Sequence, residues 1–277
     1  MELRYIKVNP SGNTTILVAD SLPRDKYADV SVKLMADTNL CAEQVGFVEK
    51  PENPSAAARL QMMGGEFCGN ASRSFAAWIA LGGLEGYRLK NFSEEEKEVT
   101  IEVSGHEGTL TARVQNGGSD HSCIAEIEMP LPEEIRHGNN VRMGEYSIVI
   151  FEGITHVILW GKPASEEYID IVSNFLADQG LDNDCFGIEF YDEKTASMIP
   201  VVYIGAVGSL VWESSCGSGS VAVAAAIVHK QKRSIEHMQI RQPGGDLFVS
   251  VDWDCGIKAA RLSGDIIITA AGTAYID

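Results

Sequence analysis

The sequence predicts an α+β protein built from two similar halves, each with strands wrapped around a buried helix. Two observations lead to this prediction. A Cys-Gly motif that opens an apolar helical run occurs at Cys68 and again at Cys216, and strands and helices follow in the same order around both. Exact identity between the halves is weak, so the repeat rests on the order of the elements and on the two motifs.

The first half begins with two strands between Lys7 and Asp20, joined by a turn at residues 9–13. A polar helix follows over residues 25–38. The apolar run after Cys68 is a second helix, and Gly82-Gly83 ends it. Three further strands complete this half, over residues 98–103, 108–114 and 123–129.

The second half repeats this outline. Two strands lie between Tyr146 and Trp160, with a break at Glu152-Gly153, and a polar helix covers residues 165–179. The run after Cys216 is apolar on every face, which is typical of a helix buried on all sides. Four strands follow, over residues 238–241, 247–251, 256–262 and 265–270.

A proline-rich segment over residues 130–134 is the expected joint between the halves, because it follows a finished strand. We therefore predict an N-terminal domain over residues 1–130, which carries Cys68. The C-terminal domain over residues 131–277 carries Cys216, with the option that its last strand packs on the first domain.

Composition favours an enzyme that acts on a small molecule. The net charge of −17 argues against nucleic acid or an anionic membrane as partner. The start lacks a signal peptide and no stretch is long and apolar enough to span a membrane, so we expect a cytoplasmic protein. The six cysteines contain no CxxC pair, so neither a metal site nor a disulfide is expected.

The two Cys-Gly motifs indicate acid–base chemistry. At a helix start, unpaired backbone N–H groups and the positive end of the helix dipole favour a thiolate over a thiol. Two such thiols suggest a pair that faces one site and moves a proton from one face of a carbon to the other. The other cysteines, at 41, 123, 185 and 255, lack this context and are expected to be structural.

At these motifs the chain resembles the diaminopimelate epimerase superfamily. The resemblance covers essentially the whole chain and is carried by Cys68-Gly69-Asn70, Cys216-Gly217-Ser218-Gly219, Gly12-Asn13 and Gly153-x-x-His156. Members are cofactor-independent racemases and epimerases in which two cysteines flank the α carbon of an amino acid. The resemblance implies two pseudo-symmetric domains, each a mostly antiparallel barrel-like sheet around a central helix, with the site in the cleft between them.

Within that superfamily the chain is more similar to the histidine racemases of staphylopine-type metallophore pathways. The shared phrases are residues 9–13, 43–47, 66–71, 212–219, 242–245 and 274–276. Diaminopimelate epimerase carries a Glu-Arg pair ahead of its second cysteine motif, and residues 208–214 contain no Arg here. The resemblance therefore implies racemisation of histidine rather than epimerisation of diaminopimelate.

The resemblance also implies roles for individual residues. Cys68 and Cys216 are the catalytic pair and exchange the roles of base and acid with the hand of the substrate. Asn13 and Asn70 contact the amino and carboxylate groups of the amino acid, and Glu43 holds the imidazole ring. The remaining expected binding residues are Gly69, Gly217 and Ser218 at the helix starts, Glu213 beside the substrate ammonium, and His156 near a cysteine.

No cofactor is expected, since no Lys stands in a context that favours a pyridoxal Schiff base. Plainer interpretations stay open for several residues: Asn13 and Asn70 as turn and capping residues, His156 as a packing residue, and Glu43 as a surface acid. The alternative functions are another amino acid epimerase of this fold, including a diaminopimelate epimerase, and a non-catalytic amino acid-binding protein. The oligomeric state is open, with a homodimer as one option.

Overall fold

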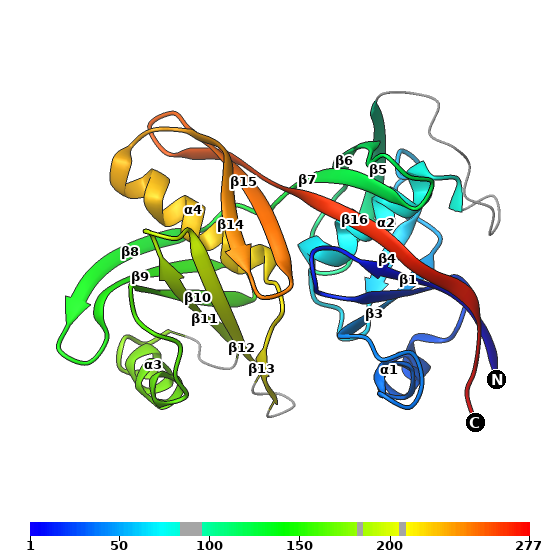
Figure 1. The fold of residues 1–277 in the computed structure, drawn as a ribbon, viewed down its shortest axis with the longest axis horizontal. Helices are drawn as coiled ribbons and strands as arrows, with labels where there is room; N and C mark the ends of the chain where they lie inside the picture. The colour runs from blue at the N-terminus through cyan, green and yellow to red at the C-terminus, as the bar shows by residue number, and fades with distance from the viewer. Residues whose placement is uncertain (84–95, 182–184, 205–208) are drawn as a thin grey trace. The chain divides into compact units, whose positions relative to one another are not determined.

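Strands dominate the structure, a computed structural model that describes residues 1–83, 96–181, 185–204 and 209–277. The contacts within the chain group it into two compact units (Figure 1). The first contains Met1–Glu128 and Ser263–Asp277, and the second contains Met129–Leu262. The last strand therefore belongs to both, because its final part pairs with the first strand of the chain.

The sheet of the first unit closes on itself. In spatial order its strands are β1 (Glu2–Asn9), β2 (Thr15–Val18), β3 (Gln44–Glu49), β4 (Arg59–Met62), β5 (Glu96–Val103), β6 (Leu110–Asn116), β7 (Ser122–Glu128) and β16 (Ile257–Tyr275). β16 also pairs with β1, which completes the ring. Parallel pairing occurs at β2–β3 and β4–β5, and β1–β2, β3–β4, β5–β6 and β6–β7 are antiparallel.

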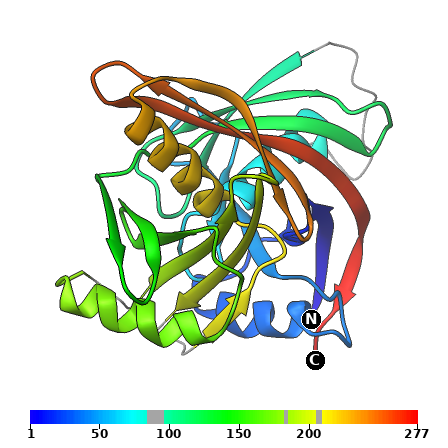
Figure 2. The same ribbon diagram turned by 60° about the vertical axis from the view of Figure 1, so that its left-hand side comes forward.

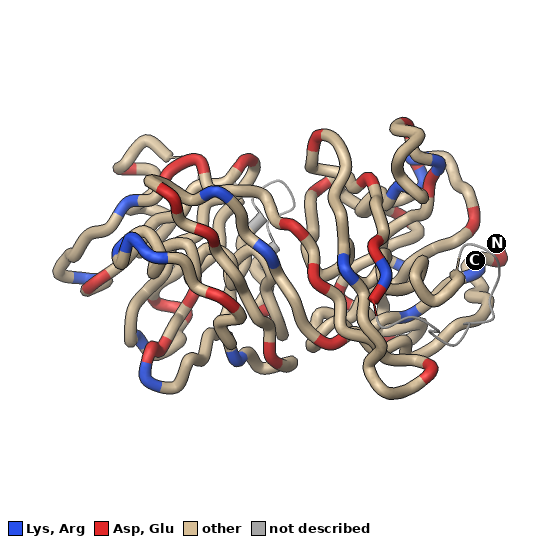
Figure 3. Tube along the Cα trace, turned by 90° about the horizontal axis from the view of Figure 1, so that it is seen from above, with Lys and Arg blue, Asp and Glu red and all other residues tan. Residues whose placement is uncertain are grey.

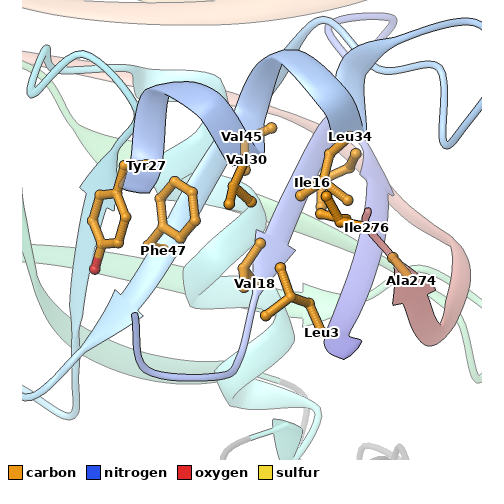
Figure 4. Packing of buried hydrophobic residues seen from close by; sticks show 10 residues of the cluster. All are labelled: Leu3, Ile16, Val18, Tyr27, Val30, Leu34, Val45, Phe47, Ala274 and Ile276. Carbon is orange, nitrogen blue, oxygen red and sulfur yellow. The ribbon is translucent and has the colours of Figure 1, made fainter. Parts of the chain in front are cut away.

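Two α-helices accompany this sheet. α2 (Gly69–Ala80) contacts β2, β5, β6 and β7 and is buried along almost its whole length. The short η1 (Arg24–Lys26) leads into α1 (Tyr27–Met35), as the predicted helix over 25–38 anticipates. α1 buries Val30 and Leu34 against the strands, and Tyr27 stacks on Phe47 with ring centroids 3.6 Å apart (Figure 4). Burial of this apolar face holds α1 on the sheet.

The second unit is built from the same parts. Its strands are β8 (Glu134–Asn140), β9 (Gly144–Phe151), β10 (Ile154–Trp160), β11 (Cys185–Asp192), β12 (Ser197–Ile204), β13 (Ser209–Trp212), β14 (Ile235–Gln242), β15 (Gly245–Trp253) and the start of β16. The helix α3 (Glu167–Asp178) occupies the place of α1 in the chain order. The buried α4 (Gly217–Gln231) contacts β9, β10, β11, β14 and β15 (Figure 2).

The pairing pattern establishes the internal repeat. β9–β10 is antiparallel, β10–β11 parallel, β11–β12 antiparallel, β12–β14 parallel and β14–β15 antiparallel. This is the sequence of directions found from β1 to β6. β8 pairs antiparallel with β9 in the way that β16 pairs with β1. The predicted α+β class and its two similar halves are thus confirmed, and each helix that follows a Cys-Gly motif holds the same place in its unit.

The sequence-based strand list needs correction at the end of the chain. Two strands were expected there, over residues 256–262 and 265–270, with a break at Ser263-Gly264. The structure instead has one strand, β16, from Ile257 to Tyr275. Gly264 does not interrupt it, because tertiary pairing with other strands overrides the weak local preference of glycine.

Acidic residues outnumber basic ones along both units (Figure 3). Lys and Arg occur singly or in short runs among them. Within the described residues, no helix combines the length and apolarity required to cross a membrane.

Candidate active site

Cys68 is the N-cap of α2. Its backbone is extended, and its Sγ accepts a hydrogen bond from the backbone N–H of Ala71 at 3.4 Å. The hydroxyl of Ser72 donates to the Cys68 carbonyl at 2.8 Å, which fixes the chain at this point. The sulfur therefore takes the place that Ser or Asp usually takes at a helix start, at the positive end of the helix dipole.

Cys216 caps α4 in the same way. Its Sγ accepts from the backbone N–H of Gly219 at 3.4 Å, and the Ser220 hydroxyl donates to the Cys216 carbonyl at 2.6 Å. The Ser218 hydroxyl lies 3.5 Å from the sulfur. The two motifs thus match position by position, although Cys68 is half-buried and Cys216 is only 6% exposed.

The expectation that a helix start favours a thiolate is wrong for Cys216. Burial raises the pKa of the Cys216 thiol well above its ordinary value, and the negative charges of Glu213 and Glu189 raise it further. Hydrogen bonds from Ser218 and from the Gly219 N–H lower it by less. Burial can shift a pKa by about 3 to 5 units, whereas a helix end contributes about 0.3 to 1 kcal/mol, so burial wins.

Three predicted binding residues come together in the first unit. Asn13 donates through Nδ2 to the Oε2 of Glu43 at 3.1 Å, and its Oδ1 lies 3.5 Å from the Nδ2 of Asn70. Gln44, which the sequence analysis missed, donates to Asn13 Oδ1 at 2.6 Å. Asn13 and Asn70 are buried and Glu43 is exposed, so the group ends in a carboxylate at the surface. Since Asn70 directly follows Gly69 at the start of α2, this group lies beside Cys68.

His156 is fully buried and pairs with a residue that the sequence analysis missed. Its Nδ1 lies 2.8 Å from the Oε1 of Glu189 on β11, and neither side chain is exposed. His156 Nε2 and Glu189 Oε2 have no hydrogen-bond partner. The signal in the sequence is a lone acid in the apolar run Cys185–Phe190, which is rare in a buried strand unless the acid is paired.

Glu189 also contacts the start of α4. A Cβ placed on Gly219 would lie 2.4 Å from the Glu189 carboxyl carbon, so only glycine leaves room there. The matching residue in the first motif is Ala71, three positions after Cys68. The second motif therefore needs its glycine in order to admit a carboxylate, and the first does not.

Gln242 holds Cys216 from another strand. Its Oε1 accepts the Cys216 backbone N–H at 2.7 Å, and its Nε2 donates to the Ser220 hydroxyl at 3.0 Å. Gln242 pairs with Gly245 across a two-residue turn, which confirms the hairpin expected at residues 242–245. The start of α4 is thus tied to β14 through one amide side chain.

The remaining predicted residues lie at the same helix starts. Gly69 and Gly217 are the first residues of α2 and α4, and Glu213 lies three positions before Cys216 and is partly exposed. The other four cysteines cap no helix in the described chain, and burial raises the pKa of Cys123 to about 12. No group of three or more His, Cys, Asp or Glu within the described residues is arranged to hold a metal ion.

The whole chain has well-defined relatives. Residues 2–275 match the family described as "Histidine racemase CntK N-terminal domain". The chain belongs to the histidine racemase CntK family. A histidine racemase of Fusobacterium nucleatum is 38% identical over 282 residues, which cover 99% of this chain and 97% of that one. One of Staphylococcus aureus is 29% identical and covers 99% and 98%.

The fold has solved counterparts. A probable proline racemase from Agrobacterium radiobacter aligns over 99% of this chain and 93% of its own with a TM-score of 0.68, at 12% identity. That likeness shows the fold alone. Membership in this family confirms the resemblance that the motifs around Cys68 and Cys216 indicated, and with it the class of racemases and epimerases.

We expect Gly219→Ala to be destabilising, because the new methyl group overlaps the buried Glu189 carboxylate. The cost should be about 1 to 3 kcal/mol in the free energy of unfolding, as for overpacking of a core. Urea unfolding followed by circular dichroism measures it.

The matched control is Ala71→Gly, which changes the equivalent position of the first motif. It should cost about 1 to 2 kcal/mol, from the lower helix propensity of glycine and the loss of one buried methyl group, with no overlap of side chains. A Gly219→Ala variant as stable as the parent would show that Glu189 moves aside freely.

Proposed function

We propose that this protein interconverts L- and D-histidine without a cofactor, with Cys68 and Cys216 as its two acid–base groups. The observation that supports this most strongly is the pair of cysteine N-caps, each on the buried central helix of its unit and each with its sulfur bonded to a backbone N–H. Membership in the histidine racemase family supports the same reaction. A binding protein would have no need of two matched thiols.

The proposed chemistry is a two-step proton transfer. One sulfur, as thiolate, takes the α proton and becomes a thiol, and the other, as thiol, donates its proton to the opposite face of the carbanion and becomes a thiolate. The α C–H is a very weak acid and a thiol has a pKa of about 8.5, so the negative charge that forms must be stabilised. Backbone N–H groups at the starts of α2 and α4, around Gly69, Asn70, Gly217 and Ser218, supply donors for the substrate carboxylate.

The group beside Cys68 suits the rest of the amino acid. The amides of Asn13 and Asn70 can bind the amino and carboxylate groups, and the carboxylate of Glu43 can accept a charge-assisted hydrogen bond from an imidazole N–H. Glu213 is assigned to the substrate ammonium and His156 to a supporting place behind Cys216. Residues 208–214 contain no Arg that could bind the distal carboxylate of diaminopimelate.

No metal or organic cofactor is needed for this chemistry, since both proton carriers and the charge-stabilising donors are protein groups. A homodimer stays a prediction.

We expect Cys68→Ala and Cys216→Ala each to abolish racemisation. The remaining thiol should still exchange the α proton of one enantiomer with deuterated solvent and return it to the same face, and the two variants should act on opposite enantiomers. Proton NMR of pure L- and pure D-histidine in deuterated buffer measures this.

Cys41→Ala is the matched control and should leave racemisation unchanged, because Cys41 is exposed and caps no helix. Near-normal racemisation by either of the first two variants would disprove the two-thiol mechanism. If diaminopimelate reacts faster than histidine, the proposed substrate is wrong, but the two-thiol mechanism still stands.

Glu43→Gln should weaken the binding of histidine by about 1 to 3 kcal/mol, because it removes the charge of a charge-assisted hydrogen bond and keeps the shape. The Michaelis constants for histidine and for neutral amino acids measure the selectivity of the effect. Glu236→Gln, at an exposed acid on β14, is the control. Equal losses for all substrates would show that Glu43 supports the fold or the chemistry and not the ring.

A further inference from the structure

A buried cation lies behind the start of α2. Arg73 is completely buried on this helix, five residues after Cys68. Its guanidinium donates to the side-chain Oδ1 of Asn70 at 2.9 Å and to the carbonyls of Gly264 and Ala125 at 3.0 and 3.4 Å, while its Nε makes no hydrogen bond. No carboxylate in the described chain bonds to it. A buried charge without a counter-ion is costly, so its retention calls for a reason.

Arg73 stays charged near neutral pH, because burial lowers its pKa only to about 10. Three groups would act on it with a negative charge when ionised: Cys68, Cys123 and Asp265. Cys123 is a neutral thiol near pH 7, since burial raises its pKa to about 12, and Asp265 is exposed to solvent. Of these groups only Cys68 lies at the start of α2, two residues before the Asn70 amide that Arg73 holds, so a thiolate there would be the counter-ion at this helix start.

Arg73 also orients a predicted binding residue. Because its Nη2 donates to Asn70 Oδ1, the amide oxygen of Asn70 is occupied and its Nδ2 is left as a donor, 3.5 Å from Asn13 Oδ1. A donor is the group that a substrate carboxylate needs beside the helix start. One buried side chain thus orients the amide and places a positive charge behind the helix start that Cys68 caps.

The second unit carries the opposite charge at its helix start. The residue five positions after Cys216 is Val221, so no cation lies there. The buried acid Glu189 instead lies against Gly219, whose N–H donates to the Cys216 sulfur, and Glu189 is bonded to His156. Glu213 is the second acid that acts on Cys216. These charges oppose a thiolate at Cys216.

We infer that Arg73 is a positioning residue which orients the Asn70 amide and holds Cys68 as the thiolate of the substrate-free enzyme, while Glu189 keeps Cys216 as the thiol. The inference rests on the proposed two-thiol function. The free enzyme then receives the enantiomer whose α proton faces Cys68. After one turnover Cys68 is the thiol and Cys216 the thiolate, and the two exchange protons with solvent before the next substrate of the same hand reacts.

The test is the pH dependence of iodoacetamide alkylation, mapped by mass spectrometry. Cys68 is followed in a Cys216→Ala background and Cys216 in a Cys68→Ala background, with all other residues kept. The pH at which the alkylation rate is half-maximal reports the pKa of the thiol, whereas the accessibility of the sulfur changes only the maximal rate. We expect this midpoint to be lower for Cys68 than for Cys216. The reverse order, measured with Arg73 unchanged, would by itself overturn the inference.

Arg73→Gln removes the charge and keeps hydrogen-bond donors, and it should raise the Cys68 midpoint by about one pH unit or more. Arg73→Lys keeps the charge and should restore a midpoint near that of the parent. Arg113→Gln, at an exposed Arg of β6, is the control and should not shift the Cys68 midpoint.

In the second unit, Glu189→Gln should lower the Cys216 midpoint. A folded Arg73→Gln variant with an unchanged Cys68 midpoint would contradict the inference.

The outcomes separate this inference from the proposed function. If the midpoints shift in the variants but the parent protein does not racemise histidine, the role of Arg73 stands and the proposed substrate is wrong. If the parent racemises histidine but Arg73→Gln leaves the Cys68 midpoint unchanged, the substrate stands and the role of Arg73 is wrong. Circular dichroism of each variant shows whether it is folded.

Discussion

The hydrogen bond from a backbone N–H to a cysteine sulfur at the start of a buried helix is the interaction on which this protein depends. A buried helix start cannot leave its N–H groups to water, so a side chain must cap it. In α2 and α4 the cap is Cys68 or Cys216. The contact that satisfies the helix thus also fixes the reactive atom, and the strands that contact each helix hold the helix in place.

The two units use one geometry with different electrostatics. Each motif has the same cap and the same serine bonded back to the cysteine carbonyl, at Ser72 and Ser220. Glycine at 219 in place of alanine at 71 admits Glu189 to the second helix start. A racemase needs one base and one acid at a time. Two cysteine caps of the same geometry with different neighbouring charges therefore suit the reaction better than two caps with identical surroundings.

The parts of this structure that could be predicted from the sequence are those set by local pattern. The helices after Cys68 and Cys216 follow from apolar runs behind a capping motif, and the hairpin at residues 242–245 follows from its turn residues. Pairing between distant segments leaves no local signal, so the continuity of β16 through Gly264 was missed. For the same reason Glu189 was missed, because its contact with Gly219 joins β11 to α4.

If both thiols serve one α carbon, the isotope content of substrate and product during turnover will show it. L-histidine is converted in deuterated water by the unmodified protein, and both enantiomers are separated during the first few per cent of reaction. With two bases, D-histidine should carry deuterium at the α carbon while the remaining L-histidine keeps its proton, because a different group returns the hydrogen. Deuterium entering both enantiomers at the same rate would instead indicate a single base and would rule out the two-thiol mechanism.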